Sequence, residues 1–322
     1  MGNFAFLFTG QGAQYADMGK DLRGKYSLFK ETFGEASEHL KIDLASICSD
    51  SEELSKTHNA QAAIFTTSYG IYRLFAEKNI KPVCMAGFSL GEITSFAASE
   101  ILNFGDALDL IKIRGKVMSE ACEYKPGSMY SVIGAPDELV EEVCESVSKK
   151  TNGYVIPANY NCPGQVVISG EADAAEKAAG IFSEKKIRTV RLNVAGAFHS
   201  GMMRHGQEEL TDFLRSINFS PPETTLYSNV TGERFSFGDF KTKDEIKSFM
   251  TDYIPRQMSN PVKFRAELEN ISKSENSCDL FIEAGAGKVL SGFVKRTLGG
   301  AKSLSVQDTD SFEAAVVTLS QN

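Results

Sequence analysis

Short apolar segments alternate with longer segments of helical periodicity along most of this chain, and this alternation limits the folds open to it. The short segments have the composition of strands and cover residues 4–8, 83–88, 129–133, 154–158, 166–168, 187–192, 225–229, 280–283 and 304–306. Apolar residues at spacings of three and four predict helices at residues 27–39, 60–77, 91–98, 105–121, 136–149, 173–183, 202–215, 244–253 and 289–297. Strands that alternate with helices predict an α/β fold with a mainly parallel sheet.

The segment from residue 127 to residue 193 departs from simple alternation. Its predicted order is strand, helix, strand, strand, helix, strand, with the turn between the two middle strands at residues 161–164 (Asn-Cys-Pro-Gly). This is the ferredoxin-like order. We therefore expect a small subdomain at residues 127–195, inserted into a large α/β body formed by residues 1–126 and 196–322. The cleft between two such lobes is the usual place for a ligand.

The composition excludes several classes of protein. Of the 322 residues, 42% are hydrophobic and 24% are charged, as in a globular protein rather than a disordered or fibrous one. No apolar stretch approaches the roughly 20 residues that span a bilayer, and the first residues lack the pattern of a secretion signal. The net charge of −8, without a dominant cluster of Lys and Arg, argues against nucleic acid as a partner.

Cysteine and histidine are sparse and scattered along the chain. The six cysteines include no Cys-x-x-Cys pair, and the four histidines include no His-Glu-x-x-His pattern. We therefore expect a cytoplasmic protein with reduced thiols, no membrane span and no metal centre.

The sequence Gly87-Phe88-Ser89-Leu90-Gly91 carries the first candidate for chemistry. It follows a predicted buried strand and begins a predicted helix, which is the position of a nucleophile elbow. Glycine on each side of the serine permits the tight turn that exposes its hydroxyl, and the helix N-terminus faces developing negative charge. The pattern alone could mark an ordinary helix start, but the flanking strand and helix favour Ser89 as a nucleophile.

A serine hydroxyl is a weak nucleophile near neutral pH and needs a base. His199 is the best candidate, because it follows the last strand of the expected insertion in a loop that can return to the cleft. His39 and His58 lie in polar or helical contexts, and His205 falls in the predicted helix after His199. On position alone, a structural role for His199 is the alternative.

Two further segments suit a site for acyl groups. The loop Gly10-Gln11-Gly12-Ala13-Gln14 follows the first strand, and its backbone N–H groups, with that of Leu90, could bind an oxyanion. The alternative for this loop is an ordinary glycine turn. Arg114 lies on a predicted helix that otherwise faces a core. Its guanidinium is either a solvated charge on the helix surface or a group that binds a carboxylate through two hydrogen bonds.

Six motifs occur in a fixed order along the chain, namely residues 10–14 (Gly-Gln-Gly-Ala-Gln), 87–92 (Gly-Phe-Ser-Leu-Gly-Glu), 114–118 (Arg-Gly, then Met), 158–165 (Ala-Asn-Tyr-Asn-Cys-Pro-Gly-Gln), 196–200 (Gly-Ala-Phe-His-Ser) and 257–262 (Gln, then Asn-Pro-Val). With these motifs the chain resembles the malonyl-CoA:acyl-carrier-protein transacylases of fatty-acid synthesis over essentially its whole length. The fold of that family, an α/β-hydrolase-like body with an inserted ferredoxin-like lobe, agrees with the order of strands and helices described above.

The resemblance implies the catalytic roles of five residues. Ser89 would accept the acyl group, and His199 would act as its base and later as its acid. The backbone N–H groups of Gln11 and Leu90 would bind the oxyanion. Gln257 matches the position whose main-chain carbonyl orients the histidine, in place of the acid of a triad, and no Asp or Glu between Ser89 and His199 stands out as a third member.

The resemblance also implies how the substrate binds. Arg114 would bind the malonyl carboxylate, while Met118 and Asn161 match positions that line the cleft. Phe198 belongs to the Ala-Phe-His pattern of malonyl-selective relatives and would occupy the space of a 2-methyl branch. One position departs from the family, which commonly has His before the serine where this chain has Phe88, so the polarity around the nucleophile is left open.

The implied reaction needs no cofactor. Ser89 would take the malonyl group from malonyl-CoA and pass it to the phosphopantetheine thiol of holo-acyl carrier protein. Three alternatives stay open: a discrete acyltransferase of a polyketide synthase, a serine thioesterase or hydrolase that passes the acyl group to water, and a non-catalytic module that binds a carrier protein.

Overall fold

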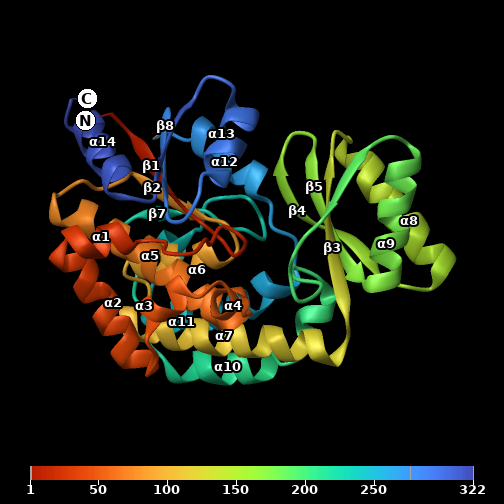
Figure 1. Cartoon of the computed structure of the whole chain (residues 1–322), viewed down its shortest axis with the longest axis horizontal. Helices are drawn as coiled ribbons and strands as arrows, with labels where there is room; N and C mark the ends of the chain where they lie inside the picture. Colours follow the sequence, from red (N-terminus) through yellow and green to blue (C-terminus); the bar gives the residue numbers. More distant parts are fainter. Residues whose placement is uncertain (1, 276, 322) are drawn as a thin grey trace.

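Two sheets, each in its own lobe, organise the computed structural model, which describes residues 2–275 and 277–321 (Figure 1). The larger lobe contains a five-stranded sheet in the order β7-β2-β1-β8-β9, and every neighbouring pair is parallel. Its strands are β1 (Phe4–Phe8), β2 (Cys84–Gly87), β7 (Thr225–Leu226), β8 (Leu280–Ala284) and β9 (Lys302–Val306). The predicted α/β fold with a parallel sheet is confirmed.

Strand β1 shows why the sheet is buried on both faces. Its five residues are all buried, as expected for a central parallel strand with helices on each side. The rings of Phe4, Phe6 and Phe8 face one side, where Phe6 packs against Phe75 of α5 (Thr57–Glu77). Ala5 and Leu7 face the other side with residues of α12 (Phe264–Lys273) and α13 (Val289–Leu298).

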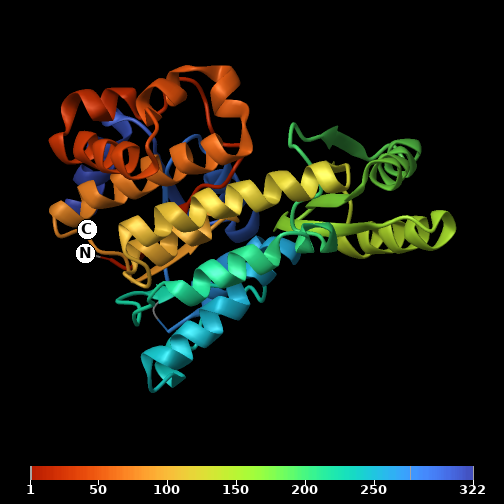
Figure 2. The ribbon, with the colours of Figure 1, turned by 90° about the horizontal axis from the view of Figure 1, so that it is seen from below.

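The remaining helices of the larger lobe surround this sheet and extend from it (Figure 2). They are α1 (Lys20–Lys25), α2 (Ser27–Leu40), α3 (Leu44–Ser49), α4 (Ser51–Ser55), α6 (Leu90–Ala98), α7 (Phe104–Tyr124), α10 (Gln207–Ser216), α11 (Lys243–Ser259) and α14 (Thr309–Ser320), with short 3₁₀ helices η1 (Gly201–Arg204) and η2 (Phe237–Asp239). Helix α10 packs between α7 and α11. No helix in the described ranges has the length and hydropathy needed to cross a membrane.

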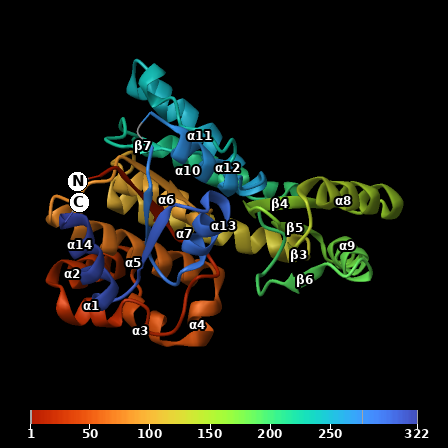
Figure 3. The same cartoon turned by 90° about the horizontal axis from the view of Figure 1, so that it is seen from above.

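The smaller lobe is an antiparallel sheet covered by two helices on the side away from the larger lobe (Figure 3). Its strands, in the order β4-β5-β3-β6, are β3 (Gly127–Ile133), β4 (Val155–Cys162), β5 (Gln165–Glu171) and β6 (Arg188–Arg191). Helices α8 (Asp137–Thr151) and α9 (Ala172–Glu184) bury a separate apolar cluster against the sheet. This strand order is the ferredoxin-like one that the sequence predicts.

The two lobes are joined by backbone hydrogen bonds as well as by the chain itself. The N–H of Tyr160 donates to the carbonyl of Val262 at 2.8 Å, and the N–H of Val262 donates to the carbonyl of Ala158 at 2.9 Å. Beside them, the guanidinium of Arg265 pairs with the carboxylate of Asp137 at 2.6 Å. These contacts hold β4 against the segment that follows α11, so they fix one side of the space between the lobes.

The helix expected at residues 202–215 is wrong in its first part. The segment forms the 3₁₀ helix η1 and then α10, and the two are separated at Gly206, whose φ of +80° is in the left-handed region. His205 therefore lies between the helices rather than in one, and its ring stacks on Tyr124 at 4.2 Å. Helices α1, α3, α4, α12 and α14 are not among those that the periodicity predicts.

Substitution of Gly91 by alanine should destabilise the larger lobe. Gly91 lies in α6, and a Cβ at this position would lie 2.0 Å from the carbonyl oxygen of Phe8 in β1. Since a backbone atom of the central strand cannot yield, we expect the free energy of unfolding to fall by about 3 kcal/mol or more, as measured by urea denaturation.

Gly34→Ala provides the matched control. Gly34 lies inside α2 with nothing within 4 Å of its Cβ position. Alanine should therefore raise the free energy of unfolding by about 0.5–1 kcal/mol through helix propensity. Similar effects of the two substitutions would contradict the close packing of α6 on β1.

Candidate active site

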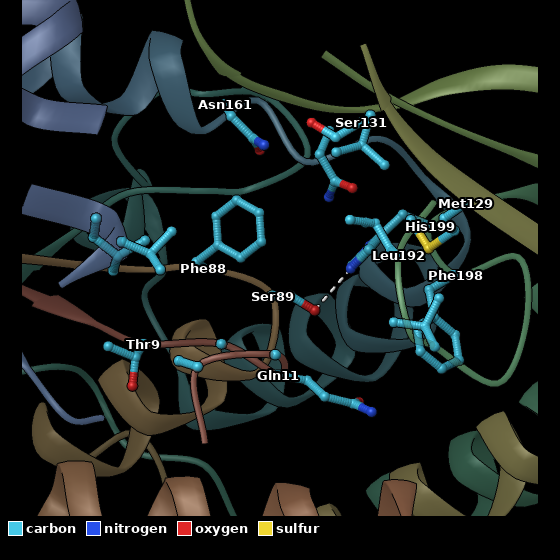
Figure 4. Close-up of a pocket in the computed structure, with 18 of the residues that line it drawn as sticks. Thr9, Gln11, Phe88, Ser89, Met129, Ser131, Asn161, Leu192, Phe198 and His199 are labelled. Carbon is cyan, nitrogen blue, oxygen red and sulfur yellow. Dashed lines mark hydrogen bonds between the residues drawn. The ribbon is translucent and has the colours of Figure 1, made fainter. Parts of the chain in front are cut away.

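A cavity of about 330 Å³ lies between the lobes, at the carboxyl ends of β1, β2 and β8 (Figure 4). This is the usual position of a ligand in an open α/β sheet. Both lobes contribute to its lining, which includes six of the residues predicted from the sequence: Gln11, Ser89, Met118, Asn161, Phe198 and His199.

The turn between β2 and α6 is a nucleophile elbow. Ser89 has φ 55° and ψ −102°, a combination that costs a non-glycine residue roughly 1–3 kcal/mol. A Cβ on Gly87 would lie 2.0 Å from the carbonyl carbon of Gly91, so the chain can turn this sharply only with glycine there. The geometry that the Gly-x-Ser-x-Gly pattern predicts is therefore present, and it places the Ser89 hydroxyl in the cavity.

His199 lies directly opposite this hydroxyl. Its Nε2 is 2.7 Å from Ser89 Oγ, and its Nδ1 is 3.1 Å from the main-chain carbonyl oxygen of Gln257. A carbonyl oxygen only accepts, which assigns the ring proton to Nδ1 and leaves Nε2 to accept the serine proton. A backbone carbonyl thus occupies the place that a carboxylate has in a Ser-His-Asp triad.

The surroundings keep His199 neutral. Burial is the main cause that lowers the pKa of its imidazole to about 4, and the nearby Arg114 cation adds to the effect. At neutral pH the imidazole is neutral, with its proton on Nδ1, and the unprotonated Nε2 can act as a base.

Arg114 is a buried cation that touches the nucleophile. Its side chain is 1% exposed; Nη1 donates to Gln61 Oε1 at 2.7 Å, and Nη2 donates to Ser89 Oγ at 3.1 Å and to Gln257 Oε1 at 3.3 Å. Burial lowers the pKa of Arg114 to about 10, so the guanidinium stays charged at neutral pH. Throughout the described part of the chain, no carboxylate lies within ion-pair distance of it. The reading of Arg114 as a solvated surface charge is wrong.

Two backbone N–H groups are available beside the serine. Leu90 is the first residue of α6, where an α-helix leaves its N–H groups without intrahelical partners. Gln11 lines the cavity from the loop after β1. Across residues 2–275 and 277–321, neither N–H has a backbone or side-chain acceptor. Both could donate to an oxygen that becomes negative during a reaction at Ser89.

The remaining wall of the cavity is mostly apolar. Phe88 is half-buried, lines the cavity and packs edge-on against Phe264 at 5.4 Å, so the residue before the nucleophile contributes an apolar ring in place of an imidazole. Phe198 lines the cavity next to His199, and Met118 Sδ accepts a hydrogen bond from Gln61. In contrast, Asn161 Oδ1 is buried without a partner among the described residues, which leaves an acceptor for a ligand.

Several residues behind the elbow were missed by the sequence analysis. The side chain of Asn229, in the turn after β7, accepts a hydrogen bond from the N–H of Ser89. The side chain of Gln61 accepts one from Arg114. Glu92, Glu267 and Tyr253 are buried close to Asn229. Only two of these had a signal in the sequence, because Glu92 belongs to the elbow motif and Asn229 ends a predicted strand.

A Ser–His pair on an elbow at the carboxyl edge of a parallel sheet defines a class of enzymes that pass acyl groups through a serine ester, either to water or to another acceptor. Comparison with known proteins shows which family of this class the chain belongs to. The model of the Acyl transferase domain family matches residues 5–317. Over 324 aligned residues, the chain is 36% identical to the malonyl CoA-acyl carrier protein transacylase of Bacillus subtilis, with 100% of this chain and 98% of the relative covered.

Solved structures give the same result. The malonyl CoA-acyl carrier protein transacylase of Clostridium perfringens superposes with a TM-score of 0.90 at 37% identity, covering 99% of this chain and 98% of that one. A malonyl-transacylase in complex with a type II PKS acyl-carrier protein superposes with a TM-score of 0.89 at 32% identity, covering 99% and 100%. The chain belongs to the malonyl-CoA:acyl-carrier-protein transacylase family, so the resemblance that the motifs indicate is confirmed.

The pKa of His199 predicts an unusual pH profile. Only the neutral imidazole can take the serine proton, so the rate should fall as the pH decreases through about 4 instead of through the ordinary value of 6.5. The measurement is the rate at which a neutral sulfonyl fluoride labels Ser89 between pH 3.5 and pH 8, with circular dichroism at each pH as the control for folding. A midpoint near 6.5 would contradict the described environment of His199.

Proposed function

We propose that this chain transfers the malonyl group of malonyl-CoA to the phosphopantetheine thiol of holo-acyl carrier protein through an ester of Ser89, and so supplies malonyl groups for fatty-acid synthesis. One observation carries the proposal. Arg114 is a buried cation without a carboxylate partner in the described part of the chain, and it lies 3.1 Å from the nucleophile. Burying such a charge is costly unless an anion joins it, and a malonyl group on Ser89 brings its carboxylate to this place.

The first half of the reaction forms the ester. Ser89 Oγ attacks the thioester carbonyl while its proton moves to Nε2 of His199, which is 2.7 Å away. The oxyanion accepts hydrogen bonds from the N–H groups of Gln11 and Leu90. The carbon–sulfur bond then breaks, and the imidazolium gives its proton to the CoA sulfur.

The second half repeats these steps with a different thiol. The carrier thiol gives its proton to His199, and its sulfur attacks the ester carbonyl. The carbon–oxygen bond breaks and Ser89 recovers the proton. The carbonyl of Gln257 holds the imidazole in the required tautomer in both halves. No cofactor takes part, because every proton moves between the serine, the imidazole and a sulfur.

The malonyl group is selected by charge and by shape in this proposal. Arg114 forms two parallel hydrogen bonds with its carboxylate, which an acetyl group lacks. Phe198 and Met118 are both buried and line the cavity. We infer that Phe198 occupies the space that a 2-methyl branch would need. Asn161 offers its unpartnered Oδ1 to the arm of the thioester.

A second candidate keeps this chemistry and changes the carrier. The similarity to the malonyl-transacylase solved with a type II PKS acyl-carrier protein favours it, since that structure covers 99% of this chain. The two candidates differ in the carrier protein that binds, not in the geometry around Ser89. A hydrolase or a non-catalytic module remains the contrasting outcome of the experiment below.

The proposal includes the organisation and location of the chain. Residues 127–195 form the inserted subdomain and residues 1–126 with 196–322 form the body, which is supported by the antiparallel sheet with α8 and α9 between residues 127 and 191.

A cytoplasmic location is supported by the buried cysteines, among which the Sγ atoms of Cys84 and Cys278 are 3.9 Å apart, too far for a disulfide.

Labelled malonyl-CoA tests the function directly. With wild-type protein alone we expect a stable malonyl-enzyme and little free malonate, and with holo-acyl carrier protein we expect the label on the carrier. Ser89→Ala should remove the covalent label while the free energy of unfolding stays within about 1 kcal/mol, because the hydroxyl supports little packing. Malonate release without carrier would indicate a hydrolase, and an unlabelled wild-type protein would indicate a binding module.

Arg114→Ala tests the selection of malonyl over acetyl. Loss of the guanidinium leaves the malonyl carboxylate desolvated and unpaired, so kcat/KM for malonyl-CoA should fall about 10²- to 10³-fold. The rate with acetyl-CoA should hold or rise, and Arg114→Lys should recover only part of the loss because a point charge cannot form the two-pronged contact. Equal losses for both substrates would show that Arg114 is structural instead.

A further inference from the structure

We propose that Asn229 is a positioning residue that holds the elbow of Ser89 in its reactive geometry, and that Glu267 and Glu92 orient it. The inference rests on the proposed function only in taking Ser89 as the nucleophile. Asn229 belongs to none of the six motifs, and it lies 140 residues from Ser89 in the sequence.

The topology brings Asn229 to the elbow. It follows β7, which pairs in parallel with β2, and Leu226 of β7 is in register with Met85 of β2. Because the carboxyl ends of parallel neighbours meet at one edge, the turn after β7 lies beside the turn after β2. Asn229 is fully buried there.

The carboxamide of Asn229 uses all its hydrogen-bonding capacity. Its Oδ1 accepts from the N–H of Ser89 at 2.8 Å and from Gln257 Nε2 at 3.3 Å. Its Nδ2 donates to the carbonyl of Gly87 at 2.6 Å and to Glu267 Oε1 at 2.9 Å. An amide has two acceptor and two donor positions, and all four are filled. The side chain therefore bridges the residue before Phe88 and the nucleophile itself.

Neither aspartate nor serine can make these four contacts. Aspartate has the same shape but cannot donate, so an oxygen would face the carbonyl of Gly87 and the carboxyl of Glu267. Serine is too short to reach both backbone groups. Because Oδ1 faces a backbone N–H and Nδ2 faces a backbone carbonyl, the orientation of the amide is determined by its partners.

A second layer of buried groups holds Asn229. Its backbone N–H donates to Glu92 Oε1 at 2.8 Å, and the hydroxyl of Tyr253 donates to the same oxygen at 2.6 Å. Burial raises the pKa of Glu92 to about 8 and holds the pKa of Glu267 well above its usual value. Glu267 Oε1 accepts from Nδ2 at 2.9 Å, and burial of this carboxyl disfavours a negative charge behind the nucleophile.

Gln257 connects this network to the base. Its side-chain Nε2 donates to the main-chain carbonyl of Ser89 at 2.7 Å, and its main-chain carbonyl accepts from His199 Nδ1 at 3.1 Å. The peptide groups on both sides of Ser89 are thus held, one by Asn229 and one by Gln257. The distance between Ser89 Oγ and His199 Nε2 and the direction of the Leu90 N–H both depend on this frame.

Asn229→Asp is the primary test. It keeps the shape and removes the donor, so the single-turnover rate of malonyl-enzyme formation should fall about 10²-fold or more while KM for malonyl-CoA changes less than threefold. Labelling by a neutral sulfonyl fluoride, which needs no malonyl site, should fall in parallel. Rates are normalised to folded protein, measured by its urea unfolding transition.

Glu267 gives a second test in case Asn229→Asp does not fold. Glu267→Gln keeps an oxygen that accepts from Nδ2, whereas Glu267→Leu removes it. The glutamine variant should therefore retain at least about tenfold more of the acylation rate than the leucine variant. Asn59→Asp is the matched control, because Asn59 is buried and bonded to Glu53 at 3.0 Å, away from the cavity; it should lower stability and leave the rate unchanged.

The outcomes separate positioning from stability. If folded Asn229→Asp protein, or folded Glu267→Leu protein where the first does not fold, reacts at the wild-type rate, the network is only structural and the proposal is overturned. A rise in KM equal to the loss in kcat/KM would also overturn it. If wild-type protein forms no malonyl-enzyme, the proposed function fails, and sulfonyl fluoride labelling of Ser89 still decides the role of Asn229.

Discussion

The close approach of α6 to the ends of β1 and β2 determines where every other part of the site can lie. A Cβ on Gly10 would lie 2.3 Å from the carbonyl oxygen of Phe88, one on Gly87 would lie 2.0 Å from the carbonyl carbon of Gly91, and one on Gly91 would lie 2.0 Å from the carbonyl oxygen of Phe8. Three glycines therefore let three backbone segments meet. The strained serine that results is stable only because its neighbours leave it no other conformation.

The electrostatics of the site follow from this crowding. Water is excluded from the groups behind the nucleophile, so burial dominates the pKa of each of them. It lowers the pKa of His199 to about 4 and holds the pKa of Glu267 well above its usual value, and Arg114 remains the one buried cation described at the nucleophile. A neutral imidazole and a single cation beside the nucleophile suit a thioester whose other end is a carboxylate.

The sequence predicts what local patterns encode and misses what distant contacts create. Each of the nine strands in the described ranges overlaps an apolar run that predicts it, although β4 continues to Cys162 and so shortens the turn predicted at residues 161–164 to Pro163 and Gly164. The sequence Gly87-Phe88-Ser89-Leu90-Gly91 predicts the elbow because strand, turn and helix are contiguous. The burial of Arg114 could not be predicted, since periodicity does not show what covers a helix. Asn229 was missed for a similar reason, because its partners lie in β2, α11 and α12. The break at Gly206 depends on a φ of +80° that the spacing of apolar residues does not reveal.

The proposed reaction couples substrate charge to base strength. In the free protein the Arg114 cation lowers the pKa of His199 in addition to burial. A malonyl carboxylate bound to Arg114 offsets that positive charge, so the imidazole becomes a stronger base only when a substrate with a carboxylate is present. Acetyl-CoA leaves the cation uncompensated and the base weak. In the proposed reaction Arg114 would therefore contribute twice to selection, through its contact with the malonyl carboxylate and through the proton affinity of the imidazole that activates Ser89.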